Sequence, residues 1–211
     1  EEARKVIEGA RSVCTEAGIA LAGGHSIDIS DPIFGLAVSG VAGTENIKQN
    51  NQAKAGNLLY LTKALGIGII TTSEKNGIVS TDHKELAVEL MTTLNKAGLH
   101  FAELEYVSSM TDVTGFGLLG HLIEMAEGSN LHAQIEFKRI PVIDGLEAYI
   151  EKKSLPGGTF RNWKSYGHKV GDITKQQRAI LCDPQTSGGL LIAVEASKKE
   201  LFENEANALD L

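Results

Sequence analysis

The chain has 211 residues, and 42% of them are hydrophobic, which is enough for a sizeable core in one domain and a piece of a second. Its formal net charge of -7 argues against a nucleic-acid groove as the main activity, because binding a phosphate backbone needs clustered Lys and Arg. Two cysteines exclude a disulfide framework or a zinc cluster, and no run approaches the roughly twenty apolar residues of a membrane span, so we expect a cytoplasmic protein.

The first part of the chain predicts one helix, two strands and a polar connection. Residues 1–17 carry apolar or small side chains with the repeat of an amphipathic helix, and neither a cap nor an initiating Met precedes them. Short apolar runs at 19–22 and 33–41 predict strands. Residues 44–56 are rich in Asn, Gln, Lys and Glu, so we expect them to connect two domains.

The rest of the chain predicts an α+β domain, because strand patterns and helix patterns are both present. No internal repeat or low-complexity segment is visible. The predicted strands are 58–62, 132–137 and 190–194, and the predicted helices are 66–74, 82–97, the segment that contains Leu118 to Met125, and a final helix in 197–211.

The segment from Met110 to His121, MTDVTGFGLLGH, is the most informative one. It places the carboxylate of Asp112 between two threonine hydroxyls, before three glycines and an apolar helix. A carboxylate is a hard oxygen ligand that suits Mg²⁺, while glycines and the free N–H groups of a helix start let the backbone approach phosphates. The same residues also fit a plain helix entrance, in which Thr111 or Asp112 is the cap. This segment alone leaves the two interpretations open.

Two further segments have the composition of a ligand-binding turn. Gly23, Gly24, His25 and Ser26 lie between apolar runs and offer a flexible backbone, one imidazole and one hydroxyl, which suit phosphate oxygens. Residues 183–189, DPQTSGG, form a polar turn with a glycine pair before a buried type of strand. Each segment also fits an ordinary loop, and a lone histidine is more often structural.

Five motifs in order cover nearly the whole chain: GGHSID at 23–28, LTKALGIG at 61–68, TDVTGFGLLGH at 111–121, PGGTFRN at 156–162 and DPQTSGGLL at 183–191. Held together, they resemble the selenophosphate synthetase family, also called selenide, water dikinase, in its bacterial form. The sequence departs from that family at Ala64, where proline is usual, and at Asn57, where aspartate is common.

The resemblance implies an ATP-dependent enzyme that makes selenophosphate from selenide and releases AMP and phosphate, with Mg²⁺ bridging the phosphates of the nucleotide. Asp112 falls on the family's magnesium-binding aspartate. Residues 23–26 fall on a nucleotide-binding segment that contributes across the interface of a homodimer. Residues 183–189 carry no implied catalytic role and are similar to an architectural signature near the site.

The resemblance also implies the α+β (two-layer α/β) architecture of aminoimidazole ribonucleotide synthetase, the PurM fold. On that mapping residues 1–43 are the tail of an N-terminal ATP-binding α/β domain, 44–56 are a linker, and 57–211 are most of a C-terminal α+β domain. The family's reactive Cys or selenocysteine and its lysine have no counterpart here, so we expect an internal fragment that is inactive alone. Sheet edges left open should lower its solubility or change how it pairs.

Two other functions stay open. A sister enzyme of the same ATP-binding superfamily, such as aminoimidazole ribonucleotide synthetase, thiamine phosphate kinase or the hydrogenase-maturation dehydratase, would share the fold but lack GGHSID together with TDVTGFGLLGH. A nucleotide-free oligomerisation module would fit the absence of the catalytic start.

Five single polar residues are also of interest. Lys63 follows a predicted strand, where it could reach a phosphate or simply be solvated. His121 and Glu124 lie one turn apart on a predicted helix, which favours packing and pairing over a metal site. Arg161 and Asn162 fit either an anion-facing loop or a packed surface loop.

Overall fold

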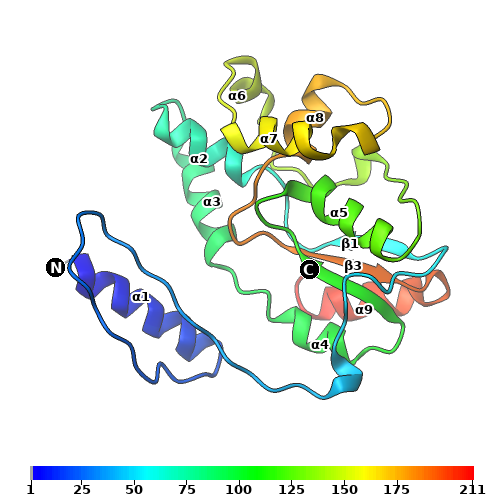
Figure 1. The fold of residues 1–211 in the computed structure, drawn as a ribbon, viewed down its shortest axis with the longest axis horizontal. Helices are drawn as coiled ribbons and strands as arrows, with labels where there is room; N and C mark the ends of the chain where they lie inside the picture. Colours follow the sequence, from blue (N-terminus) through cyan, green and yellow to red (C-terminus); the bar gives the residue numbers. More distant parts are fainter. Residues whose placement is uncertain (1) are drawn as a thin grey trace. The chain divides into compact units, whose positions relative to one another are not determined.

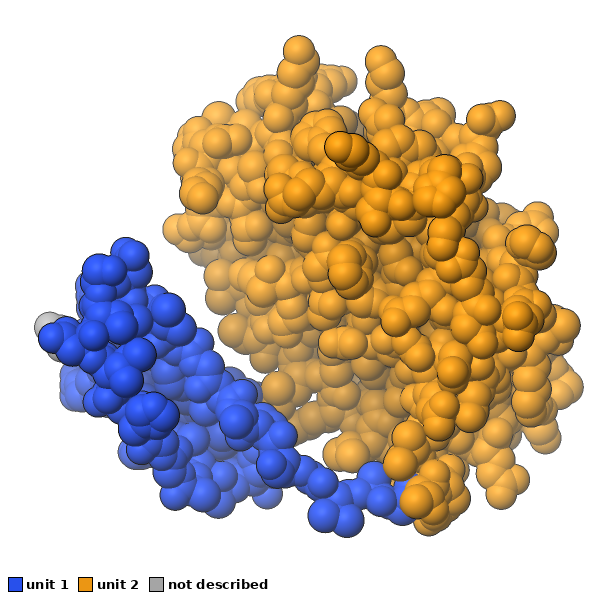
Figure 2. Space-filling view, in the orientation of Figure 1, with its two compact units in different colours: residues 1–43 blue, residues 44–211 orange. Residues whose placement is uncertain are grey.

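The computed structural model describes residues 2–211, and the chain divides after Gly43 into two compact units (Figure 2). No helix among the described residues is long and apolar enough to cross a membrane. The first unit contains helix α1 (Glu2–Glu16), which confirms the predicted amphipathic helix. Its apolar stripe buries Ala10 and Cys14.

The rest of the first unit is extended chain (Figure 1). The predicted strands at 19–22 and 33–41 are wrong, because no described segment pairs with either of them. A strand forms only where its N–H and C=O groups meet those of a partner. The apolar side chains of these segments therefore remain exposed, as at Ile33 (82%) and Val38 (71%).

The second unit is built on a three-stranded antiparallel sheet with the order β1, β3, β2. The strands β1 (Leu58–Leu61) and β3 (Leu190–Val194) confirm two of the predicted strands. The strand β2 (Val107–Asp112) lies on the other side of β3, with Asp112 opposite Leu190. β2 was not predicted from the sequence, where Asp112 was expected just before a helix.

The helices of the second unit follow the predicted pattern in part. The predicted helix 82–97 ends at Thr92, since Thr93 is already extended, and a separate helix begins at Ala97. The predicted strand at 132–137 is wrong, because this stretch pairs with no described strand. The helices are α2 (Ile67–Lys75), α3 (Thr81–Thr92), α4 (Ala97–Glu103), α5 (Gly117–Gly128), α6 (Glu147–Glu151), α7 (Gly157–Tyr166), α8 (Lys175–Leu181) and α9 (Lys199–Ala208).

Each face of the sheet has its own hydrophobic core, because successive residues of a strand point to opposite faces. Leu191 and Ala193 of β3 pack in the larger core with apolar residues of α2, α5 and α8. Ile192 packs in the smaller core with Phe101 of α4 and Phe202 of α9. Helices therefore cover both faces of the sheet (Figure 1), which confirms the α+β class and adds a layer to the predicted two-layer arrangement.

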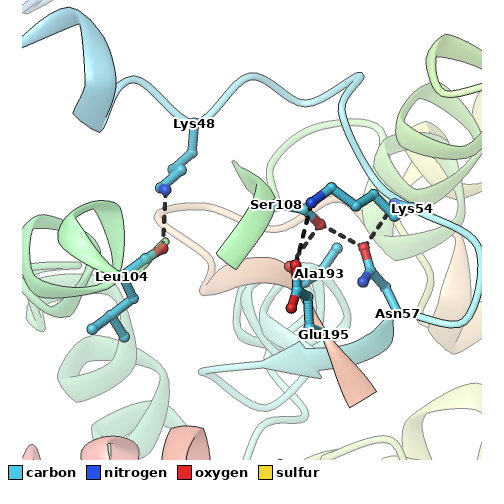
Figure 3. A network of polar contacts seen from close by, with 7 residues as sticks. All are labelled: Lys48, Lys54, Asn57, Leu104, Ser108, Ala193 and Glu195. Carbon is cyan, nitrogen blue, oxygen red and sulfur yellow. Dashed lines mark hydrogen bonds and ion pairs between the residues drawn. The ribbon is translucent and has the colours of Figure 1, made fainter. Parts of the chain in front are cut away.

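The polar stretch 44–56, predicted as a connection between domains, is fixed to the second unit. The ammonium of Lys48 donates to the carbonyl of Leu104 over 3.0 Å (Figure 3). The hydroxyl of Ser109 donates to the carbonyl of Gln49 over 2.7 Å. This stretch therefore packs as part of the second unit, while the assignment of the units as two domains of the family stays a prediction.

Asn57, where the family commonly has aspartate, ties the start of β1 to β2 and β3 (Figure 3). Its side-chain oxygen accepts hydrogen bonds from the N–H of Lys54, over 2.7 Å, and from the hydroxyl of Ser108. That hydroxyl also lies 3.2 Å from the carbonyl of Ala193, and Lys54 pairs with Glu195 at 3.2 Å. The amide keeps the acceptor oxygen that this network uses, so the departure from the family leaves the network intact.

Candidate functional site

Asp112 is the last residue of β2, and its side chain is exposed. Within residues 2–211 no hydrogen bond or ion pair engages its carboxylate, so both oxygens are free to bind a cation. Helix α5 begins only at Gly117, and its N-cap residue Phe116 makes no side-chain cap. The interpretation of Thr111 or Asp112 as the cap of this helix is therefore wrong.

The Asp112 loop, residues 113–117, is held by backbone hydrogen bonds to the DPQTSGG motif. The N–H of Val113 donates to the carbonyl of Gly189 over 2.8 Å. The carbonyl of Thr114 accepts the N–H of Gln185 over 3.0 Å. Two motifs that are far apart in the sequence therefore meet beside Asp112.

Two glycines allow the backbones of these motifs to come this close. A Cβ at Gly188 would overlap the carbonyl oxygen of Val113. Gly117 has a φ of +67°, in the left-handed region, and a Cβ there would lie 2.8 Å from the carbonyl carbon of Cys182. Both glycines thus serve the close packing of the Asp112 loop against its neighbours.

His121 of α5 holds the Asp112 loop through Thr114. Its Nε2 accepts the N–H of Thr114 over 3.0 Å and lies 3.2 Å from the Thr114 hydroxyl. A ring nitrogen that accepts an N–H carries no proton, so the neutral imidazole has its proton on Nδ1, which is buried without a hydrogen-bond partner. Burial lowers the pKa of His121, against the opposing effect of the Asp112 and Glu124 carboxylates. Glu124, at 3.9 Å, is too far for a hydrogen bond, so the important contact is the one to Thr114.

Helix α7 supplies two more contacts to this loop. The amide of Asn162 donates to the carbonyls of Gly115 and Cys182 over 2.9 and 3.0 Å. The hydroxyl of Tyr166 donates to the carbonyl of Phe116 over 2.6 Å. Asn162 is buried, so its interpretation as part of an anion-facing loop is wrong. Its spacing of i, i+4 to Tyr166 is the sequence signal that places both side chains on one helix face.

Asp183 and Gln185 cap the N-terminus of α2 from a distant loop. The Oδ2 of Asp183 accepts the N–H groups of Gly68 and Ile69 over 2.9 and 3.3 Å, and the Oε1 of Gln185 accepts the N–H of Gly66 over 3.2 Å. Asp183 has no exposed surface, and burial raises its pKa to about 7, although hydrogen bonds from Gln185, Ile69 and Gly68 oppose the shift. These contacts support the architectural interpretation of the DPQTSGG motif.

Lys63 is buried, and its ammonium donates to three carbonyl groups of the described residues. Its ammonium donates to the carbonyls of Leu90, Thr93 and Ser187 over 2.9, 2.7 and 2.8 Å. Burial lowers its pKa. Neither the phosphate-binding nor the solvated interpretation of Lys63 is correct, because the side chain joins the end of α3 to the DPQTSGG motif.

Gly23, Gly24, His25 and Ser26 lie in the first unit, in exposed chain without regular structure. A Cβ on either glycine would meet no neighbouring atom within 4 Å. Their role in nucleotide binding stays a prediction.

The carboxylate of Asp112 is suited to be one ligand of a magnesium site. Mg²⁺ is commonly bound through one or two carboxylates, with water and substrate phosphates as the remaining ligands. Asp112 offers one exposed carboxylate without a partner, and within residues 2–211 no group of three or more His, Cys, Asp or Glu side chains is arranged to hold a metal.

The fold of the second unit belongs to one class of protein. Residues 54–211 match the family described as AIR synthase related protein, C-terminal domain, and the chain belongs to that family.

Its similar relatives are named more specifically. The chain is 55% identical over 208 residues to "Selenide, water dikinase" of Pasteurella multocida, covering 98% of this chain and 59% of the relative. It is 55% identical over 213 residues to the protein of that name from Colwellia psychrerythraea, covering 100% of this chain and 62% of the relative. It is 58% identical over 195 residues to that from Haemophilus influenzae, covering 92% of this chain and 56% of the relative. These matches confirm the resemblance given by the five motifs. The chain spans 56% to 62% of the length of these relatives.

Two solved structures share the fold at low sequence identity. Thiamine-monophosphate kinase from Stenotrophomonas maltophilia is 15% identical, with a TM-score of 0.56 over 80% of this chain and 49% of that one. Hydrogenase maturation protein HypE is 13% identical, with a TM-score of 0.50 over 76% of this chain and 42% of that one. At these identities the likeness concerns the fold alone, and it supports the predicted PurM-like architecture.

Proposed function

We propose that the whole protein is a selenophosphate synthetase, which makes selenophosphate from selenide and ATP and releases AMP and phosphate. The relatives of that name, at 55% to 58% identity, support this activity over that of a sister enzyme. The structural observation that carries the proposal is Asp112, an exposed carboxylate that lies at the end of a strand and has no partner among residues 2–211. The loop that follows it is held from several sides.

In this proposal Asp112 is a ligand of Mg²⁺, which when bound neutralises charge on the phosphates of ATP. This chain's own part is to hold the carboxylate in place. β2 fixes the backbone of Asp112, and the loop that follows is tied to α5, α7 and the DPQTSGG motif. A carboxylate on a backbone that is already fixed loses less conformational freedom when it binds the cation.

The remaining parts of the proposal rest on the resemblance to the family. Residues 23–26 would contact the nucleotide, in a homodimer whose nucleotide sites are shared across the interface. The nucleophile, a Cys or a selenocysteine, and the accompanying lysine would be supplied by the part of the whole protein that this chain does not include. We therefore expect no synthetase activity from residues 1–211 alone, and we propose that the whole protein acts in the cytoplasm.

The replacement Asp112→Asn in the whole protein tests the proposal. It removes the negative charge and keeps the size of the side chain, and charge stabilisation by a metal contributes several kcal/mol, so selenide-dependent AMP formation should fall about 100-fold or more. Asp82→Asn, at an exposed aspartate in the first turn of α3, is the matched control and should retain activity. Undiminished AMP formation by the Asp112→Asn protein would show that the metal assignment is incorrect.

A further inference from the structure

The backbone N–H of Thr114 has one acceptor within the described residues, the Nε2 of His121 at 3.0 Å. Thr114 lies two positions after Asp112, in a part of the chain that is neither strand nor helix. An N–H that loses its acceptor at a half-buried position is unfavourable, so the loop would move to find another partner. The carbonyl of Thr114 would remain tied to the N–H of Gln185, which makes the expected motion a rotation of the peptide rather than an unfolding.

We propose that His121 is a positioning residue for the metal-binding carboxylate: by accepting the N–H of Thr114, it fixes the direction in which Asp112 leaves the sheet. The inference rests on the proposed role of Asp112 and adds a residue that the sequence analysis assigned to packing. His121 itself binds no metal here, because its Nε2 is occupied by Thr114 and its Nδ1 is buried.

The chemistry of the imidazole suits this task. His121 is 7% exposed, and its Nε2 accepts the N–H of Thr114, so this nitrogen carries no proton. The ring also lies on α5, a helix whose Leu118, Leu119 and Leu122 are packed in the larger core, so the acceptor is held on a rigid element. Residues that hold a metal ligand in position tune the metal affinity, and here such a residue lies on a packed helix. The loss of such supporting residues typically weakens metal binding 10- to 100-fold.

The experiment measures Mn²⁺ binding to the whole protein by electron paramagnetic resonance, with Mn²⁺ as a probe for the Mg²⁺ site. His121→Gln keeps an acceptor at the depth of Nε2, whereas His121→Leu has none and the shorter His121→Asn does not reach Thr114. We expect Mn²⁺ affinity to fall about 10- to 100-fold in the Leu and Asn variants and to stay close to wild type in the Gln variant. In the two weakened variants, AMP formation should recover as Mg²⁺ is raised, since the site is misplaced and still present.

His83→Leu is the matched control. His83 also makes a side-chain hydrogen bond, between its Nδ1 and the hydroxyl of Tyr149 at 2.7 Å, and its loss should lower the thermal unfolding temperature without changing Mn²⁺ affinity. Asp112→Asn is the reference for the site itself. If Asp112→Asn leaves Mn²⁺ affinity unchanged, the proposed function is wrong at its metal site. If Asp112→Asn weakens Mn²⁺ binding, the metal assignment stands. The inference about His121 is then overturned if its Leu and Asn variants bind Mn²⁺ as wild type does, or if its Gln variant weakens binding as much as they do.

Discussion

The carboxyl group of Asp183 titrates near neutral pH because it is buried, with its Oδ1 free of any hydrogen-bond partner and therefore able to take up a proton without breaking a contact. Its pKa rises from the ordinary 3.8 to about 7. Between these two values the folded protein binds a proton that the unfolded chain does not. The stability that this uptake contributes is fully present below about pH 4 and is lost as the pH rises through about 7.

Asp183→Asn should therefore change the pH dependence of stability. The amide keeps an oxygen for the N–H groups of α2 and never ionises, so relative to wild type the variant should gain unfolding free energy as the pH is raised from 5 to 8. Urea unfolding of both proteins at several pH values measures this difference, and the contribution of His121 is common to both and cancels. Asp172→Asn, at an exposed aspartate, should give a curve parallel to wild type. A parallel curve for Asp183→Asn as well would contradict the assigned burial effect.

At the scale of elements, apolar spacing predicted part of the second unit and missed β2 and the helices α4, α6, α7 and α8. β1, β3, α2, α5 and α9 were predicted because their apolar spacing reports the core that they face. β2 was missed because Ser108 and Ser109 interrupt its apolar pattern, and the structure shows that these hydroxyls bind Asn57 and the carbonyl of Gln49. Such partners are tens of residues away, so no local pattern contains them.

The candidate site divides in the same way. Asp112 was selected from residue type and from the resemblance to the family, because a carboxylate next to hydroxyls and glycines is a recognisable composition. Its place at the end of β2 was not predicted, and its role in metal binding stays a prediction. The contacts from His121 and Asn162 were not, since a histidine or asparagine on a helix gives no sign of which loop carbonyl or N–H it meets. The same holds for Lys63, which lies close to Ser187 only after the chain has folded.

The link that Lys63 makes between β1, α3 and the DPQTSGG motif gives a test of element packing. Lys63→Met keeps the apolar stem and removes the ammonium, which leaves three carbonyls without their donor, including the Leu90 carbonyl of α3. We expect a loss of about 1–3 kcal/mol in the free energy of unfolding by urea. Lys54→Met removes an exposed ion pair with Glu195 and should cost less than about 1 kcal/mol. Equal losses of unfolding free energy in the two variants would mean that the buried hydrogen bonds of Lys63 contribute no more to stability than an exposed ion pair does.

At the scale of the whole molecule, the exposed apolar side chains of the first unit are the main feature that favours self-association. Extended chain with unpaired N–H and C=O groups and apolar side chains is a template for association. We expect residues 1–211 on their own to self-associate, with a sedimentation coefficient that rises with protein concentration. The double replacement Ile33→Lys and Val38→Lys, at two of the most exposed apolar positions, should reduce this rise. A clean monomer of the unchanged chain at high concentration would count against the expectation.

Gln185 touches two places at once, since its N–H meets the carbonyl of Thr114 and its side chain meets the first N–H groups of α2. A fluctuation that freed the Asp112 loop by shifting Gln185 would also take the acceptor away from the first N–H groups of α2. The start of α2 lies more than forty residues before that loop in the sequence. Openings of the Asp112 loop that cost little free energy are therefore suppressed. The loop leaves its native geometry rarely, and it does so together with the start of α2.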